Sequence, residues 1–159
     1  MDKKILIVSD IHQNKELAKR FNELEGFDLK VYLGDLDLNY NLLSDFDYIV
    51  KGNKEIDEKN EETIVFEFEG YKFLMVHGHL WTDFTGKIDF NKLYYAAKEL
   101  NVDFVLHGHD HIKANEEMDE TIKRFNPGST TMPLDGEKGS FGVFSIDEEK
   151  NTKFEHIFI

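Results

Sequence analysis

Short apolar runs alternate with helical stripes along the first part of the chain. Lys4–Ser9 is a continuous apolar run, typical of a strand that is buried on both faces. Residues 14–25 then place apolar side chains at helical spacing, and Leu29–Leu33 returns to strand character. A strand–helix–strand unit of this kind favours a parallel pair with a right-handed crossover. A short helical or loop segment at 39–44 then leads to a further strand at 48–50.

The rest of the chain is mostly β in character. Thr63–Phe68 and Tyr71–Val76 flank a Glu-Gly turn and predict a hairpin. A second helical stripe from Phe90 to Leu100 precedes a strand at Val102–Leu106. Four further strands are expected, at 112–118, 121–125, 140–146 and 152–159. The pattern predicts an α/β fold in which two mixed β-sheets pack as a sandwich with helices on the outside. At this length we expect residues 1–159 to form one domain.

Polar residues with metal-binding atoms stand where these apolar runs end. Two runs end in Gly34-Asp35 and Gly52-Asn53. Six of the seven histidines lie in three motifs that also follow apolar runs, namely Asp10-Ile11-His12, His77-Gly78-His79 and His107-Gly108-His109-Asp110-His111. Open α/β sheets place their ligand sites beyond the carboxyl ends of the strands. The repetition therefore predicts one polar, metal-binding site.

Seven side chains are candidate ligands of that site. Asp10 and His12 are spaced i, i+2, as are His109 and His111, and such pairs point to the same side of an extended segment. Glycines beside several candidates allow a sharp turn or a close approach to an ion. The candidate ligands are Asp10, His12, Asp35, Asn53, His77, His109 and His111. This number is too large for one tetrahedral ion but suits two divalent ions that share a carboxylate. Imidazole, carboxylate and amide ligands suit Mn²⁺, our first expectation, or Fe²⁺, Zn²⁺ or Ni²⁺.

Composition narrows the classes of partner. The chain has 19 basic and 32 acidic side chains, which give a net charge of −13, and no cysteine. A broad basic face that grips nucleic acid is not expected, but bound metal ions could still attract a small phosphorylated substrate. Disulfides and thiolate metal sites are excluded. With no signal-peptide pattern and no apolar run of ~20 residues, we expect no membrane partner and a cytoplasmic location. Homo-oligomer formation stays open.

The ordered motifs resemble a known family. Asp-x-His, Gly-Asp, Gly-Asn, His-Gly-His and Gly-His-x-His resemble the calcineurin-like metallophosphoesterases, especially the small single-domain bacterial and archaeal phosphodiesterases. Asn126-Pro127-Gly128-Ser129 is similar to a turn of that group. The resemblance implies a four-layer fold with two mixed sheets between helical layers. It also implies hydrolysis of phosphodiesters or small phosphate esters by attack of a metal-bound hydroxide.

The resemblance also distributes the ligands between the two ions. Asp35 would bridge them. The first ion would be held by Asp10, His12, Asp35 and His111, and the second by Asp35, Asn53, His77 and His109.

The chain departs from the family pattern at two positions. Relatives often carry His or Cys after the Gly-Asn pair, where this chain has Lys54, and Gln13 replaces a frequent glycine. A histidine at the first position helps to protonate the leaving group. Lysine donates a proton poorly at neutral pH unless its pKa is lowered, although it can hold a phosphate oxygen. We name Asn53, Lys54 and His79 as candidate catalytic residues. His79 would touch the substrate phosphate, or be an exposed loop residue.

Other interpretations remain beside this one. The alternative function is a metal-binding scaffold or interaction module on the same fold, since some relatives in trafficking complexes serve mainly as scaffolds and have altered metal motifs. The complete ligand set favours the enzyme, and Lys54 favours the scaffold. We expect a structural role for His107 and a surface position for His156. Trp81 and Phe84 either line a substrate pocket or pack within the protein.

Overall fold

Two five-stranded mixed sheets form the protein. The computed structural model describes residues 2–52, 60–134 and 138–159, so Asn53 and Lys54 lie outside the described residues. The first sheet has the order β10-β9-β1-β2-β3. β1, β2 and β3 are parallel, whereas β9 and β10 run antiparallel to their neighbours. Its strands are β1 (Lys3–Val8), β2 (Leu29–Tyr32), β3 (Tyr48–Ile49), β9 (Ser140–Ile146) and β10 (Thr152–Phe158).

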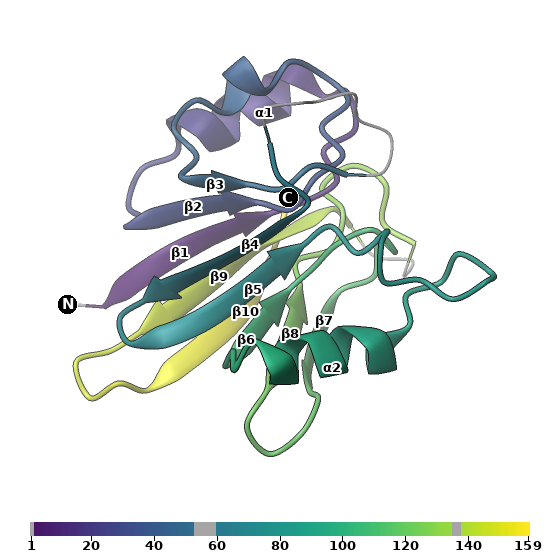
Figure 1. Cartoon of the computed structure of the whole chain (residues 1–159). Helices are drawn as coiled ribbons and strands as arrows, with labels where there is room; N and C mark the ends of the chain where they lie inside the picture. The colour runs from purple at the N-terminus through teal and green to yellow at the C-terminus, as the bar shows by residue number, and fades with distance from the viewer. Residues whose placement is uncertain (1, 53–59, 135–137) are drawn as a thin grey trace.

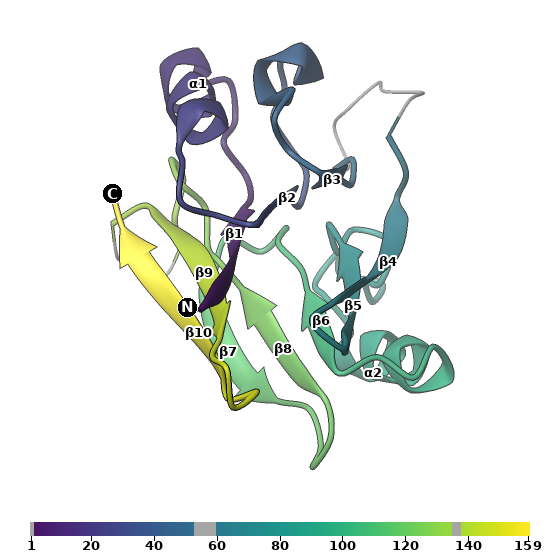
Figure 2. The ribbon, with the colours of Figure 1, turned by 90° about the vertical axis from the view of Figure 1, so that its left-hand side faces the viewer.

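The second sheet has the order β4-β5-β6-β8-β7. β5, β6 and β8 are parallel, and the outer strands β4 and β7 are antiparallel to them. Its strands are β4 (Thr63–Phe68), β5 (Tyr71–Val76), β6 (Phe104–Leu106), β7 (Ala114–Glu117) and β8 (Lys123–Asn126). Figure 2 shows the two sheets facing each other, with helices on the outer sides.

The helices cover the outer faces of the sheets. α1 (Lys15–Glu23) and the 3-10 helix η1 (Tyr40–Leu43) lie over the first sheet, and α2 (Phe90–Glu99) lies over the second (Figure 1). The Asn14 side chain caps α1 by accepting a hydrogen bond from the Leu17 N–H. Asp89 caps α2 in the same way. Among the described residues, no helix is long and apolar enough to cross a membrane.

Alternation of side chains along the strands builds three hydrophobic layers. Ile5 and Ile7 of β1 point between the sheets, where Phe73, Phe104 and Phe144 also pack. The alternate β1 residues Leu6 and Val8 pack beneath α1 and η1. On the second sheet, Leu74 and Val76 pack beneath α2. Strands buried on both faces read as continuous apolar runs, which is why the sequence marked them so clearly.

The predicted α/β sandwich with outer helices is confirmed. Both helices, the short turn before β3 and all ten strands occur where the sequence placed them. The hairpin strands β4 and β5 have the predicted bounds. β9 also has the predicted bounds. β1 begins and ends one residue earlier than predicted, and β8 begins two residues later and ends one residue later. The remaining elements are shorter than predicted by one or two residues at an end.

Burial between the sheets leads to a test of stability. The Phe144 ring is fully buried and meets Phe73, Phe104 and Phe154 at ring-centroid distances of 4.9–5.4 Å. Phe144→Ala should lower the free energy of unfolding by about 3–5 kcal/mol, because it leaves a cavity between the sheets. Phe84 is fully exposed, so Phe84→Ala should change it by no more than about 0.5 kcal/mol. Urea unfolding of both variants measures the difference, and equal effects would contradict this packing.

Candidate metal centre

Loops at the carboxyl ends of four strands carry the described candidate ligands. Asp10 and His12 follow β1, Asp35 follows β2, His77 follows β5, and the His109 and His111 pair follows β6. Backbone hydrogen bonds tie these loops together. The N–H groups of residues 10 and 12 donate to the carbonyls of residues 34 and 35 at 3.0 and 3.1 Å, and the N–H of residue 108 donates to the carbonyl of residue 77 at 2.9 Å. The loops therefore bring together candidate ligands that follow strands of both sheets.

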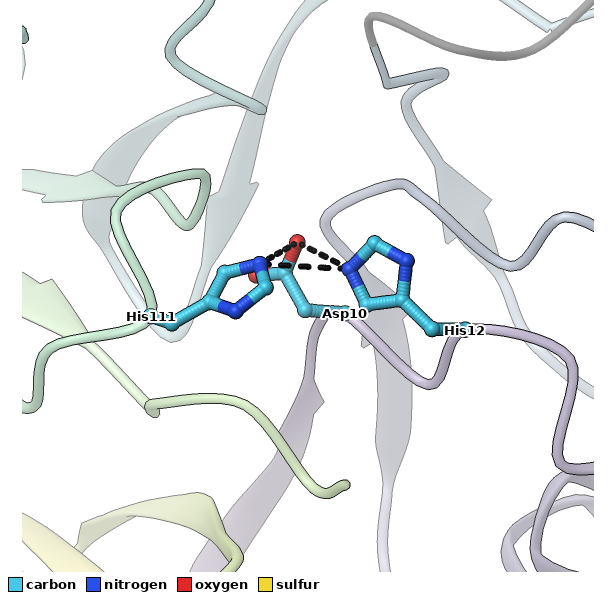
Figure 3. A group of neighbouring side chains, drawn as sticks. All are labelled: Asp10, His12 and His111. Carbon is cyan, nitrogen blue, oxygen red and sulfur yellow. Dashed lines mark hydrogen bonds and ion pairs between the residues drawn. The ribbon is translucent and has the colours of Figure 1, made fainter. Parts of the chain in front are cut away.

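One oxygen of Asp10 lies at the centre of this region. The Nε2 atoms of His111, His12 and His77 lie 3.4, 3.5 and 3.8 Å from Asp10 Oδ1. His12 Nε2 and His111 Nε2 are 3.2 Å apart. Figure 3 shows the two imidazoles converging on the carboxylate from opposite sides. Three imidazole nitrogens therefore face one carboxylate oxygen.

The other nitrogen of each ring is held by an acceptor. His12 Nδ1 donates to Asp37 Oδ2 at 2.9 Å. His77 Nδ1 donates to the Leu33 carbonyl, and His111 Nδ1 donates to the Met132 carbonyl, both at 2.7 Å. A histidine whose Nδ1–H is engaged in this way presents the Nε2 lone pair when neutral. The three rings are therefore oriented for coordination through Nε2.

The buried atoms at the centre fit a bound cation. Asp10 is fully buried, and its Oδ2 accepts hydrogen bonds from Ser9 Oγ and the His109 N–H. Within the described part of the chain, Asp10 Oδ1 and His77 Nε2 are buried and make no well-formed hydrogen bond. Buried polar groups normally have a partner, and a carboxylate with imidazoles is a typical donor set for divalent ions.

A second group of donors adjoins the first. Asp35 Oδ2 lies 3.2 Å from His77 Nε2. Donor atoms of Asp10, Asp35 and His77 lie within 4.8 Å of one another, as do those of Asp10, His12 and His111. Asp10 thus belongs to both groups. A cavity of about 430 Å³ opens beside them and is lined by His12, Gln13, Asp35, Asp37, His109, His111 and Met132.

His79 and His109 lie outside these two groups. The His109 ring lies 5.2 Å from the His77 ring, and the His79 ring lies 5.6 Å from it. Burial, followed by repulsion from His77, lowers the pKa of both histidines. His109 nevertheless lines the cavity. The positions of the predicted Asn53 and Lys54 lie outside the described residues.

Charge interactions perturb the central groups strongly. Burial raises the pKa of Asp10, but the neighbouring imidazoles of His111, His12 and His77 lower it more, so that it lies well below its usual range. The hydrogen bond with Asp10 raises the pKa of His12 to about 9. In the absence of a bound ion, protons on the imidazoles therefore compensate the buried carboxylate.

The backbone around the candidate ligands is unusual. Asp10, His12, Asp35, His109 and His111 all have positive φ angles of 46–77°. Non-glycine residues rarely adopt this region, and such strain gathers at functional sites. The pairs at 10/12 and 109/111 are therefore not in extended segments, and the reason given for their i, i+2 spacing is wrong. Asp10 and His12 still converge, because the chain curls between them.

Two glycines allow the loops to approach one another. A Cβ atom at Gly108 would lie 2.8 Å from Asp10 Oδ2 and closer still to Ser9 Oγ. At Gly34, which has a φ of +104°, a Cβ atom would lie 2.9 Å from His77 Nδ1. Any larger side chain would push the carboxylate or the imidazole out of place. The glycines beside the candidate ligands thus serve close packing as well as turns.

The two remaining histidines, His107 and His156, contact residues outside the donor groups. His107 is fully buried and accepts a hydrogen bond from Arg124 Nη1 at its Nε2, 3.1 Å away. Burial and the Arg124 charge lower the pKa of His107 to about 3, which agrees with the expected structural role. The predicted surface position of His156 is wrong. Its ring stacks on Phe125 at 4.6 Å, and its Nε2 donates to the Asn126 carbonyl, because alternation along β10 turns residues 154 and 156 to the same face.

Sequence reasoning missed residues that contact the candidate ligands, among them Ser9, which donates to Asp10 Oδ2, and Asp37. Asp37 accepts the His12 Nδ1–H and lines the cavity. Its spacing of two residues from Asp35 was the available signal. Such a spacing alone does not reveal which side chain lies opposite in the fold.

Comparison with known proteins agrees with this geometry. The sequence matches the family model "Calcineurin-like phosphoesterase superfamily domain" over residues 4–149. The chain belongs to the calcineurin-like phosphoesterase superfamily. A curated relative, "Probable metallophosphoesterase YsnB" of Bacillus subtilis, is 30% identical over 153 residues, which cover 93% of this chain and 87% of the relative.

Solved structures extend the comparison with the superfamily. The crystal structure of a predicted phosphoesterase from Streptococcus pneumoniae has a TM-score of 0.85 and 26% identity, and covers 99% of this chain and 90% of that chain. Vps29 of Entamoeba histolytica, complexed with Zn²⁺, has a TM-score of 0.75 and 22% identity, with 97% and 98% coverage. The second similarity shows a shared fold only. Membership of the superfamily implies a divalent metal site, which the donor groups around Asp10 fit.

The raised pKa of His12 makes metal affinity depend on pH. The ordinary value is 6.5, and the hydrogen bond with Asp10 raises the pKa to about 9 in the folded, ion-free protein. The stability that the Asp10–His12 pair contributes to the folded protein is fully present below pH 6.5 and is lost as the pH rises through about 9. An ion must displace the proton, so the apparent affinity for Zn²⁺ should rise from pH 7 to 9, by up to ~tenfold per pH unit for each proton released.

Calorimetric titration in buffers with different heats of ionisation measures the released protons directly. His12→Ala should release fewer protons at pH 7.5 than the wild type. An affinity for Zn²⁺ that stays constant between pH 7 and 9 would show that the ion does not displace a proton from His12.

Proposed function

We propose that this superfamily member is a phosphoesterase that uses two divalent ions to hydrolyse phosphodiesters or small phosphate esters. The observation that carries the proposal is the set of three Nε2 atoms within 3.8 Å of Asp10 Oδ1, each on a ring whose Nδ1 is held by another group. A purely structural cluster would not need to leave Asp10 Oδ1 and His77 Nε2 buried without a well-formed hydrogen bond. The arrangement is that of a preorganised metal site.

The two ions would be held by overlapping sets of residues, with Asp35 between them. Asp35 lines the cavity together with His12 and His111 from the first set. It also approaches His77 from the second set. Asp10 belongs to both donor groups but is fully buried, so it is less able to face two ions across the cavity. The first ion is assigned to Asp10, His12, Asp35 and His111, and the second to Asp35, Asn53, His77 and His109.

The protein itself contributes position and shape to the reaction. When bound, divalent ions supply positive charge to the phosphate and lower the pKa of a water molecule that can attack phosphorus. The described cavity lining contains two aspartates and no lysine or arginine, so an anionic substrate depends on the ions for its attraction. Its volume of about 430 Å³ suits a small ester. We assign His79 and Lys54 to contacts with phosphate oxygens or the leaving group, and Mn²⁺ as the preferred ion.

A second function deserves a direct comparison because the Vps29 structures share this fold. A metal-binding scaffold would keep the donor groups without turnover. The three oriented imidazoles favour catalysis, because a scaffold gains nothing from the cavity beside them. Turnover therefore separates the two functions.

Metal removal and resupply test the proposed reaction. Chelated protein should not hydrolyse bis(p-nitrophenyl) phosphate, and Mn²⁺ should restore the release of p-nitrophenolate. Asp35→Asn should lower the restored rate by at least ~100-fold, since it removes the carboxylate charge between the ions. Asp45→Asn, an exposed aspartate beyond η1, is the matched control and should keep the wild-type rate. Absence of turnover with Mn²⁺, Fe²⁺, Zn²⁺ and Ni²⁺ would refute the enzyme and favour the scaffold.

The two histidines of the His-Gly-His motif should have different roles. His77 is buried with its Nε2 directed toward Asp10 and Asp35, so His77→Ala should lower the bound metal per chain. His79 is only partly buried and lies outside both donor groups, so His79→Ala should keep the metal and lower turnover, by about 10²–10⁴-fold if it transfers a proton. Elemental analysis and initial rates measure both effects. Loss of metal in His79→Ala alone would reverse the assignment.

A further inference from the structure

Three exposed apolar side chains lie on the two loops that meet at His111, beside the cavity. Met132 lines the cavity and is 53% exposed. Leu134 and Ile112, which flank it along the two loops that meet at His111, are 72% and 45% exposed. We call Ile112, Met132 and Leu134 the apolar rim. Large apolar residues are expensive to leave in water, and a group of them beside a polar site is more informative than a single one.

Hydrogen bonds fix the apolar rim to a candidate ligand. The Met132 carbonyl accepts from His111 Nδ1 at 2.7 Å, and the Leu134 N–H donates to the His111 carbonyl at 3.1 Å. The Ser129 hydroxyl accepts from the Met132 N–H at 2.9 Å and donates to the Asp10 carbonyl at 2.8 Å. The loop at 129–134 is therefore held by hydrogen bonds against both Asp10 and His111. Movement of this loop would disturb the orientation of His111.

The size of the apolar rim indicates a small ligand. A stable protein interface buries roughly 800 Å² on each partner and involves about 20–30 residues a side. Three side chains offer far less than this, but they match one aryl ring or a short alkyl chain. The cavity that Met132 lines has a volume of about 430 Å³, within the range of small-molecule sites.

Charge favours the same kind of ligand. The chain carries a net charge of −13, and the described cavity lining supplies Asp35 and Asp37 but no lysine or arginine. A polyanion would be repelled by this surface, whereas a singly charged diester would be repelled least. Affinity for the rest of the molecule must then come from a contact that does not depend on charge. The apolar rim is such a contact.

We propose that the apolar rim binds the organic group of the substrate, so that the enzyme acts on phosphate esters that carry an aryl or alkyl group. The inference rests on the proposed function and adds the substrate class. Phosphate would sit at the ions, and the group that remains attached to phosphorus would lie against Met132 and Leu134. Polyphosphates and unsubstituted sugar phosphates would gain nothing from this contact.

Methyl resonances of methionine test the contact without turnover. The chain has four methionines, of which Met75 is fully buried and Met132 is exposed. In Zn²⁺-loaded protein labelled at the methionine methyl carbons, phenylphosphonate should shift the Met132 methyl signal by its ring current, whereas methylphosphonate should not. Met132→Leu assigns the signal, and Met75 is the internal reference.

The spectra distinguish the alternatives. Equal shifts with both phosphonates, or no shift with either, would overturn the proposal. A Met132 shift that follows protein concentration instead of phosphonate would show that the rim contacts a second copy of the chain, which would also overturn it.

Steady-state kinetics provide an independent test with two esters that share the same leaving group. Hexyl p-nitrophenyl phosphate and methyl p-nitrophenyl phosphate differ only in the group that remains on phosphorus. The wild type should prefer the hexyl ester in kcat/KM by at least about tenfold, and Leu134→Ser should reduce this preference several-fold. Leu100→Ser, in the loop that enters β6 from the end of the sheet opposite the candidate ligands, should leave the ratio unchanged.

The two arms separate the failure of this inference from failure of the proposed function. Hydrolysis of both esters with equal kcat/KM would refute the apolar subsite but keep the phosphoesterase. Hydrolysis of neither ester with any divalent ion would refute the phosphoesterase, and the phosphonate spectra would still decide whether the rim binds an apolar group.

Discussion

The buried carboxylate of Asp10 is the constraint on which the site depends. A charged group without access to water is costly unless opposite charge and hydrogen bonds surround it. Its Oδ2 accepts hydrogen bonds from Ser9 Oγ and the His109 N–H, and its Oδ1 faces three imidazoles. Asp10 follows a strand of the first sheet, whereas the imidazoles of His77 and His111 are on loops that follow strands of the second sheet. Compensation of this one charge therefore fixes how the ends of the two sheets meet.

This compensation requires loops that approach more closely than ordinary side chains allow. Gly108 and Gly34 supply the space, and positive φ angles at Asp10 and His111 turn the side chains inward. Each strained residue costs free energy that the surrounding core must offset. The phenylalanines packed between the sheets provide a rigid base for that purpose, and two of them, Phe73 and Phe104, belong to strands that end at the site. Packing and chemistry are thus parts of one arrangement.

The sequence predicted this site well at the level of strand ends and poorly at the level of contacts. Apolar runs marked β1, β2, β5 and β6. Because each strand ends at the same edge of its sheet, the position of the strand also determines where the residues that follow it lie. The partner of His12 could not be predicted, because Asp37 reaches it only through the curled loop after β2. His156 was misjudged for the same reason, since its ring depends on Phe125 from another sheet. Local pattern defines an element, whereas side-chain partners depend on how distant elements meet.

The exchange of protons for metal ions follows from the same charge balance. Without ions, protons on His12, His77 and His111 compensate Asp10, since the pKa of each of these histidines is raised. On the proposed function, divalent ions would replace those protons with a greater positive charge. That charge would compensate both the buried carboxylate and an anion in the cavity. An acidic protein with no lysine or arginine in the described cavity lining would attract phosphate in this way. The ions would then supply the attraction for phosphate, and discrimination between esters would depend on the uncharged contacts around them.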